Sequence, residues 1–210
     1  MLKSDEILII GKIGPRISVA ISKNYGKIKF IGSQHLLTLS VYSVTFYVSN
    51  SELFRVKESR FLYSFYPIVK SYNKYKYAIS VIKLINRVLP VSSPFNGLYE
   101  DTINYLKYLM FDEENVRKYY MLWLYRLISS VLGINHLLYC KSCGNYRIRY
   151  YIRSVGGFCE LCKSSGDFDI NVLEFEFLEN LNKLNFDSIR YFTVDFEKLI
   201  KIFEDLVYSY

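Results

Sequence analysis

The sequence predicts an α+β protein of several domains: an N-terminal five-stranded OB-like β-barrel, followed by an all-α domain with an inserted four-cysteine module. Short apolar runs separated by turn residues fill the first 65 residues, and after Pro67 apolar residues recur at three- and four-residue steps. Two C-x2-C pairs then stand near the end of the second third. We expect four segments: barrel 1–66, helical domain 67–137, cysteine module 138–168, and helices completing the helical domain at 169–210.

Five strands are expected in the first segment. The first covers Glu6–Ile13, an apolar β-branched run that ends at Gly14-Pro15. The others cover residues 16–22, 27–31, 36–48 and 53–65, with turns such as Asn24-Tyr25-Gly26 and Asn50-Ser51 between them. Short strands joined by tight turns favour a small antiparallel barrel, of which the OB-fold is a nucleic-acid-binding type.

Helical periodicity begins beyond the barrel. Helices are expected over 77–89, ending at Pro90, and over 98–110. A third, buried helix runs from the acidic residues 112–114 to Leu132, where Gly133 ends it. Residues 172–184 favour a helix, although 174–177 also alternate like a strand, and Thr193 is expected to cap a final helix with Asp195 and Glu197 in its first turn.

All the cysteines of the chain belong to the pattern C-x2-C-x15-C-x2-C, formed by Cys140, Cys143, Cys159 and Cys162. Thiolates at this spacing form two knuckles that close a tetrahedron around one Zn²⁺, with Gly144, Gly156 and Gly157 in the tight turns. A site closed by four thiolates has no open coordination position, so the expected zinc is structural rather than catalytic. The alternatives are two disulfides or a redox-active C-x2-C pair, and His136 is a further possible ligand.

Positive charge is concentrated in the N-terminal third. Residues 1–80 hold twelve Lys and Arg against four acids, whereas the whole chain has a net charge of +7. This distribution indicates a polyanionic partner such as nucleic acid, and the alternative is a solvated lysine-rich surface. The candidate phosphate contacts are Lys12, Arg16, Lys23, Lys27, Lys29, Arg55, Lys57, Arg60, Lys70, Lys74 and Lys76. Alternation predicts that Lys27 and Lys29 share one strand face, opposite Ile28 and Phe30.

Aromatic residues accompany these charges, and bases can stack on exposed rings. The rings are Phe46, Tyr47, Phe54, Phe61, Tyr63, Phe65 and Tyr66, of which most are expected in the core. We find no glycine-rich phosphate loop, nucleophile elbow or paired-carboxylate pattern, so we expect a protein that is not an enzyme. No run of eighteen apolar residues occurs, which predicts a cytoplasmic protein without a membrane partner.

The order of these parts resembles the RecO family of bacterial recombination mediators. Residues 3–9 resemble the first strand of that family, and 16–28 resemble its second strand and the Tyr-Gly-Lys turn into the third. Residues 78–90 are similar to the first helix of its helical domain. The segments 132–134 and 140–144 resemble the approach to its zinc module, and 156–159 resemble the second knuckle. Residues 32–36 depart from the family, because they lack its basic residues.

The resemblance implies a DNA repair and homologous recombination mediator of the RecF-pathway type. Such a protein binds single- and double-stranded DNA, anneals complementary strands, and helps to load recombinase with RecR and single-stranded-DNA-binding protein. It would bind the C-terminal tail of the latter and associate with the nucleoid in the cytoplasm. The alternatives are a zinc-ribbon and OB-fold adaptor that acts on RNA or in transcription, and a scaffold without a nucleic-acid role.

Overall fold

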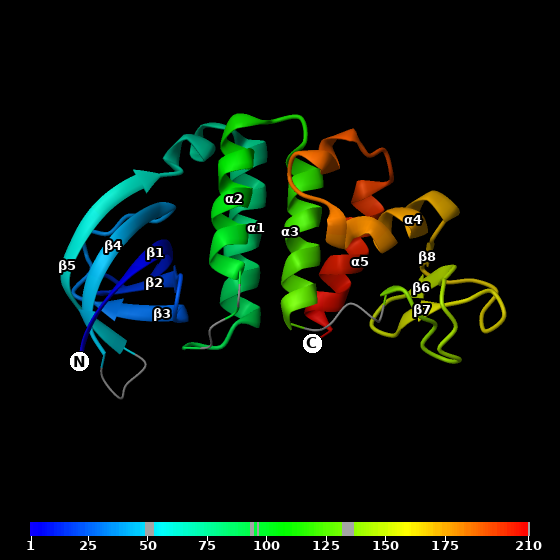
Figure 1. Ribbon diagram of the computed structural model, residues 1–210, viewed down its shortest axis with the longest axis horizontal. Coiled ribbons are helices and arrows are strands. Elements are labelled where there is room, and N and C mark those ends of the chain that lie inside the picture. The colour runs from blue at the N-terminus through cyan, green and yellow to red at the C-terminus, as the bar shows by residue number, and fades with distance from the viewer. Residues whose placement is uncertain (49–52, 93–94, 96, 132–136, 210) are drawn as a thin grey trace. The chain divides into compact units, whose positions relative to one another are not determined.

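A computed structural model of the chain describes all residues except 49–52, 93–94, 96, 132–136 and 210 (Figure 1). The described chain is α+β, as predicted, and divides into two compact units, Met1–Val116 and Arg117–Tyr210. The expected barrel segment lies in the first unit, the cysteine module lies in the second, and the expected helical domain contributes to both. The predicted turn at 50–51, the end of a helix at Gly133, the segment 132–134 and His136 fall outside the described residues.

Five strands form the N-terminal sheet at the places the sequence predicts. They are β1 (Leu2–Ile13), β2 (Ile17–Ser22), β3 (Gly26–Ile31), β4 (Ser40–Tyr47) and β5 (Leu53–Ser64). Neighbouring strands pair in the order β1-β2-β3-β5-β4, and β4 also pairs with β1. The pairing of β3 with β5 is parallel and the other pairings are antiparallel.

One face of this sheet forms a closely packed aromatic and aliphatic core. Ile28 and Phe30 of β3 are fully buried in it, as the alternation of that strand predicts. The rings of Phe46 and Phe54 stack with their centroids 5.2 Å apart, and Phe30 meets Phe46 edge-on at 5.3 Å. Because these rings come from β3, β4 and β5, the core holds together strands that lie far apart in the sequence.

The side chains on the opposite face of β2 are also buried. Val19 and Ile21 alternate with the core residue Ala20, so they lie on the outer face, yet both are buried. Helices α1 (Tyr72–Val88) and α2 (Leu98–Phe111) belong to the same unit. The chain between them reaches β3, where Ser92 N donates to Lys27 O at 2.7 Å. Together with the 3-10 helix Tyr66–Lys70 (η1), these elements complete the first unit.

A buried carboxylate fastens β1 to the turn between β2 and β3. Asp5 accepts from the hydroxyl of Ser22, from the backbone N of Asn24 at 3.0 Å and from the side-chain amide of Asn24 at 2.7 Å. Tyr25 N in turn donates to the Ser22 hydroxyl at 3.1 Å. The acceptor oxygens of Asp5 therefore satisfy the polar groups of a turn that would otherwise lack partners.

The second unit consists of helices and a small sheet. Its helices are α3 (Val116–Val131, which begins at the unit boundary), α4 (Val172–Asn180) and α5 (Phe196–Tyr208). The run 119–125 of α3 is buried, which confirms the predicted buried helix. The predicted helix over 172–184 is shorter, because 3-10 geometry replaces it at Leu181–Lys183. The predicted cap of the last helix is wrong: the side chain of Asp195, not Thr193, accepts from Lys198 N.

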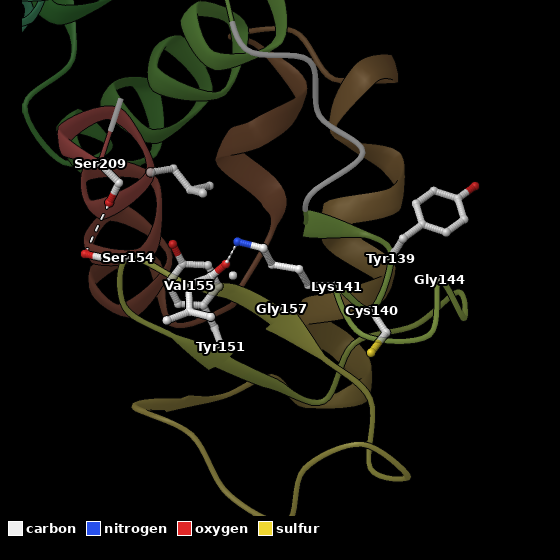
Figure 2. Close-up of a pocket in the computed structure, with 11 residues that line it drawn as sticks. Tyr139, Cys140, Lys141, Gly144, Tyr151, Ser154, Val155, Gly157 and Ser209 are labelled. Atoms are coloured by element: carbon white, nitrogen blue, oxygen red, sulfur yellow. Dashed lines mark hydrogen bonds between the residues drawn. The ribbon is translucent and has the colours of Figure 1, made fainter.

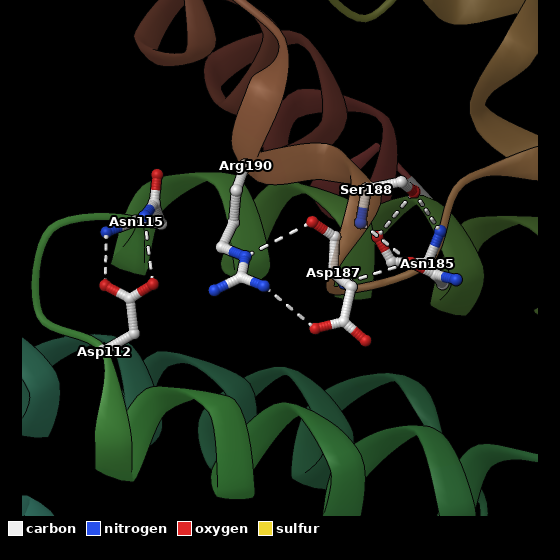
Figure 3. A network of polar contacts seen from close by, with 6 residues as sticks. All are labelled: Asp112, Asn115, Asn185, Asp187, Ser188 and Arg190. Carbon is white, nitrogen blue, oxygen red and sulfur yellow. Dashed lines mark hydrogen bonds and ion pairs between the residues drawn. The ribbon is translucent and has the colours of Figure 1, made fainter.

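Polar turns precede several helices. Asp112 accepts from Asn115 through both backbone and side chain before α3 begins (Figure 3). In the second unit, Asn185 accepts from the backbone N of Asp187 and of Ser188 before the 3-10 helix Ser188–Tyr191 (η4), and Arg190 pairs with Asp187 at 3.1 Å (Figure 3). These local bonds occupy backbone donors that the helix itself leaves unpaired.

Candidate metal centre and nucleic-acid interface

Two tight turns bring the four cysteines together. In the first, Gly144 N donates to Cys140 O at 2.8 Å, and Gly144 has a φ of +73°, which favours glycine. In the second, the backbone N of Cys162 and of Lys163 both donate to Cys159 O at 3.1 Å. The C-x2-C spacing therefore folds into two knuckles, as the sequence predicts.

The four sulfur atoms form one compact cluster. The Sγ atoms of Cys140, Cys143, Cys159 and Cys162 all lie within 4.8 Å of one another, and those of Cys143 and Cys159 are 3.6 Å apart. A tetrahedron with metal–sulfur bonds of about 2.3 Å has edges of about 3.8 Å. All four residues are free cysteines, so neither pair forms a disulfide. The residues fit one metal ion.

Electrostatics in the cluster favour a bound cation. Burial opposes ionisation of Cys140, but hydrogen bonds from the backbone of Cys159, Cys143 and Ser142 outweigh it and lower the pKa of Cys140 to about 6. Hydrogen bonds with the other three cysteine side chains raise the pKa of Cys162 to about 12. Four thiolates so close together repel one another, and a divalent cation would remove that repulsion.

A three-stranded sheet supports the second knuckle. It consists of β6 (Tyr150–Ile152), β7 (Gly156–Phe158) and β8 (Phe168–Asp169), in the order β7-β6-β8. A Cβ on Gly157 would lie 2.7 Å from Ile148 Cδ1, so glycine is needed there for close packing. Gly156 has a φ of +126°, and Lys141 N donates to Gly157 O at 2.9 Å. The predicted turn role of these two glycines is wrong, because both lie in strand β7 rather than in the knuckle turn, and Gly157 is needed for packing instead.

A carboxylate of helix α5 contacts this sheet. Asp205 Oδ2 accepts from the Tyr151 hydroxyl at 2.9 Å and from Ser154 N at 2.7 Å. Burial, reinforced by Asp205, raises the pKa of Tyr151. A pocket of about 630 Å³ lies beside these hydrogen bonds, and its lining includes Tyr151, Ser154 and Cys140 (Figure 2). The Lys141 ammonium, which also lines the pocket, donates to the Val155 carbonyl. The metal module is thus connected to the last helix of its unit.

Replacing Asp205 with alanine should loosen this junction. The change removes two hydrogen bonds to a carboxylate, so we expect the free energy of unfolding to fall by about 1–2 kcal/mol. Urea unfolding followed by circular dichroism measures the loss. Lys201→Ala on the same helix is the matched control, because Lys201 is exposed. Equal free energies of unfolding for the two variants would show that the hydrogen bonds to Asp205 do not stabilise the unit.

Most predicted phosphate contacts lie on the surface. Lys29 and Lys74 are half-buried, and the Lys74 ammonium donates to Met110 O at 3.0 Å. Lys23 forms an ion pair with Glu100 at 3.7 Å. The exposed members are Lys12, Arg16, Lys23, Arg55, Lys57, Arg60, Lys70 and Lys76. These positions lie on the sheet and its turns, on η1 and on α1.

Lys27 is placed differently from the prediction. It was expected to form an exposed basic face with Lys29, but it is only 7% exposed, and its ammonium donates to Asn86 O near the end of α1 at 2.9 Å. Burial, and then the neighbouring Lys29, lower the pKa of Lys27. Its partner is 59 residues away in the sequence. Lys27 therefore joins the sheet to a helix, and the expectation that it faces solvent is wrong.

The aromatic residues divide into two groups. Phe46, Phe54 and Phe65 are buried, as expected of core rings. The rings exposed to solvent are Tyr47, Phe61, Tyr63 and Tyr66. The expectation that most of the seven rings lie in the core is therefore wrong, because strand register, which composition does not reveal, turns four of them to solvent.

Comparisons with known proteins add no family assignment. No family model matches the chain, and a search of the curated proteins finds no match. Among the described helices, none has both the length and the apolar character needed to cross a bilayer.

Proposed function

We propose that this protein is a non-enzymatic DNA-binding mediator of recombinational repair that anneals complementary strands. The proposal rests on the order of the structural elements along the chain. Strand pairing in the order β1-β2-β3-β5-β4, with β4 also paired to β1, supports an OB-type barrel, and exposed arginines and lysines lie on and beside it. A helical region with a four-cysteine cluster follows.

The metal of the cluster is proposed to be one structural Zn²⁺. Four soft thiolates within 4.8 Å of one another suit zinc, although the same ligands also suit iron. Arg149 donates to Ile170 O at 3.0 Å and pairs with Glu160 beside the second knuckle, and both contacts support a structural role for the module. Four protein ligands leave no coordination position for a substrate.

Annealing on such a surface would need no chemical step. The exposed cations, among them Arg16 and Arg60, would neutralise the phosphates of two strands at once. Repulsion between the strands then falls, and base pairing proceeds by itself.

The proposal includes work in the RecF pathway with RecR and recombinase, and a helical surface for the C-terminal tail of single-stranded-DNA-binding protein. Association with the nucleoid follows from DNA binding.

An annealing titration against salt tests this function. The zinc-loaded protein should accelerate pairing of complementary DNA oligonucleotides at about 50 mM salt and lose most of the effect by about 200 mM, because binding releases counterions. The double variant Arg16→Ala with Arg60→Ala should anneal more slowly. Lys107→Ala, on the exposed face of α2, is the control.

Two outcomes would count against the proposal. Absence of acceleration at low salt with intact zinc would refute annealing. Acceleration confined to complementary RNA would favour the adaptor that acts on RNA or in transcription.

A further inference from the structure

The sheet face that binds oligonucleotides in OB-folds is covered in this chain. OB-folds bind oligonucleotides mainly on strands 2 and 3. In this chain the outer residues Val19 and Ile21 of β2 are buried, and Lys27 of β3 bonds to Asn86 O. The exposed side chains lie instead on β5, at the last residue of β4, at the first residues of β1 and at the last residue of β3. A nucleic-acid site should therefore be sought there.

Strand register places four outward side chains in one row across this face. Tyr47 of β4 pairs with Arg55 of β5 on one side and with Leu2 of β1 on the other. Arg55 pairs in turn with Ile31 of β3. Opposed residues on a sheet have Cβ atoms about 5 Å apart, so these side chains are neighbours. We call Leu2, Ile31, Tyr47 and Arg55 the Tyr47 row.

The side chains of the Tyr47 row are exposed despite their apolar character. Tyr47 is 46% exposed, Leu2 45% and Ile31 41%, and Arg55 is also exposed. Three apolar residues side by side around an arginine are unusual on a solvated strand face, where polar residues are the rule. The row therefore presents an aromatic ring beside aliphatic side chains, and a flat apolar ligand can pack on such a surface.

The charge of the row is positive. Arg55 forms no ion pair with any other described residue. In the next outward row, Ser4 and Thr45 are joined by their hydroxyls at 2.9 Å, and Glu58, opposite Thr45, pairs with Lys57 at 3.5 Å. Among the described residues, the carboxylate nearest in register is therefore already paired, which leaves the Arg55 guanidinium available for an anion.

We propose that the Tyr47 row binds single-stranded DNA, with an unpaired base stacked on Tyr47 and an adjacent phosphate held by Arg55. The inference rests on the proposed DNA-binding function and makes it more specific. A base within a duplex has both faces stacked on neighbours, so it cannot lie on the Tyr47 ring. The row therefore distinguishes single strands from duplex, whereas the scattered lysines attract both.

Replacing Tyr47 with valine, which suits a strand, tests the stacking. By anisotropy with a labelled thymidine oligonucleotide, Tyr47→Val should weaken single-strand binding about tenfold and leave the affinity for a duplex of equal length unchanged. Tyr47→Phe should bind like wild type, because the ring is kept. Arg55→Ala should lower the slope of log affinity against log salt by about 0.7, the contribution of one phosphate, whereas Tyr47→Val leaves the slope unchanged.

The outcomes separate this inference from the function on which it rests. If the wild-type protein binds no DNA, the proposed function fails. If it binds and Tyr47→Val stays within twofold of wild type, or weakens duplex binding equally, the stacking site is refuted. Tyr72→Ala, an exposed tyrosine on α1 outside the row, is the matched control and should bind normally. Weakening by Tyr47→Val for RNA but not for DNA would overturn the assignment to DNA.

Discussion

Replacement of Cys140 by serine is expected to unfold the metal module. The buried Cys140 side chain supplies one of four sulfurs within 4.8 Å of one another, and the surrounding sheet has strands of only two or three residues. Structural zinc contributes about 10–16 kcal/mol of apparent binding free energy to such modules. Loss of one ligand should remove enough of this to leave the module unfolded at 25 °C. Zinc content by mass spectrometry and exchange of module amides would record the loss.

Ser142→Ala is the matched control for this change, because Ser142 is an exposed residue of the same knuckle whose side chain is not a ligand. It should keep the proposed zinc ion and the wild-type melting temperature. Addition of a strong chelator to the wild-type protein should reproduce the Cys140→Ser result. A Cys140→Ser protein with one bound zinc and unchanged amide protection would show that three sulfurs are enough.

Replacement of Glu174 by alanine should cost the second unit about 3–5 kcal/mol, because it leaves a partly buried lysine without its partner. Glu174 is 1% exposed and pairs with the Lys198 ammonium, which also donates to Asp169 O at 2.9 Å. The same carboxylate accepts from Asn171 N at 2.9 Å, in a capping box at the start of α4. The Glu174–Lys198 pair therefore connects α4 to α5, and through Lys198 also to the strand β8.

Urea unfolding followed by tryptophan fluorescence suits this measurement, because the single tryptophan, Trp123, is buried in α3 of the same unit. Glu176→Ala, two residues away and exposed, is the matched control and should change stability by less than about 0.5 kcal/mol. Glu174→Gln should fall between them, since the amide keeps the shape but not the charge. Similar midpoints for the alanine variants at 174 and 176 would contradict the buried ion pair.

Features with a local cause were predictable from the sequence. The cysteine spacing predicted the cluster, because each knuckle is closed by bonds within a few residues, such as Gly144 N to Cys140 O. Alternation predicted the burial of Ile28 and Phe30, and Pro90 marked the end of α1. The prediction that Thr193 caps the last helix was wrong. Both Thr and Asp are good capping residues, but the side chain of Asp195, three residues before Lys198, is the one that accepts from Lys198 N.

Features with a distant cause were not predictable. The parallel pairing of β3 with β5, which makes Ile31 a neighbour of Arg55, joins segments 24 residues apart and has no sequence signal. The strands β6, β7 and β8 are too short to show alternation. Which tyrosine faces solvent likewise depends on register. The Tyr47 row, for this reason, could be found only in the folded chain.

The bond from Lys27 to Asn86 changes how charge-reversal experiments on this protein should be interpreted. A lysine ammonium at the last turn of a helix complements the carbonyls there that have no helical donor. Glutamate at position 27 would set a negative charge against those carbonyls, so it would separate the sheet from α1. If the protein binds DNA as proposed, a scan that reverses every lysine of the N-terminal sheet would find its largest loss of binding at Lys27. That loss would report damage to the fold, and Lys27 would be mistaken for the main residue of the proposed DNA contact.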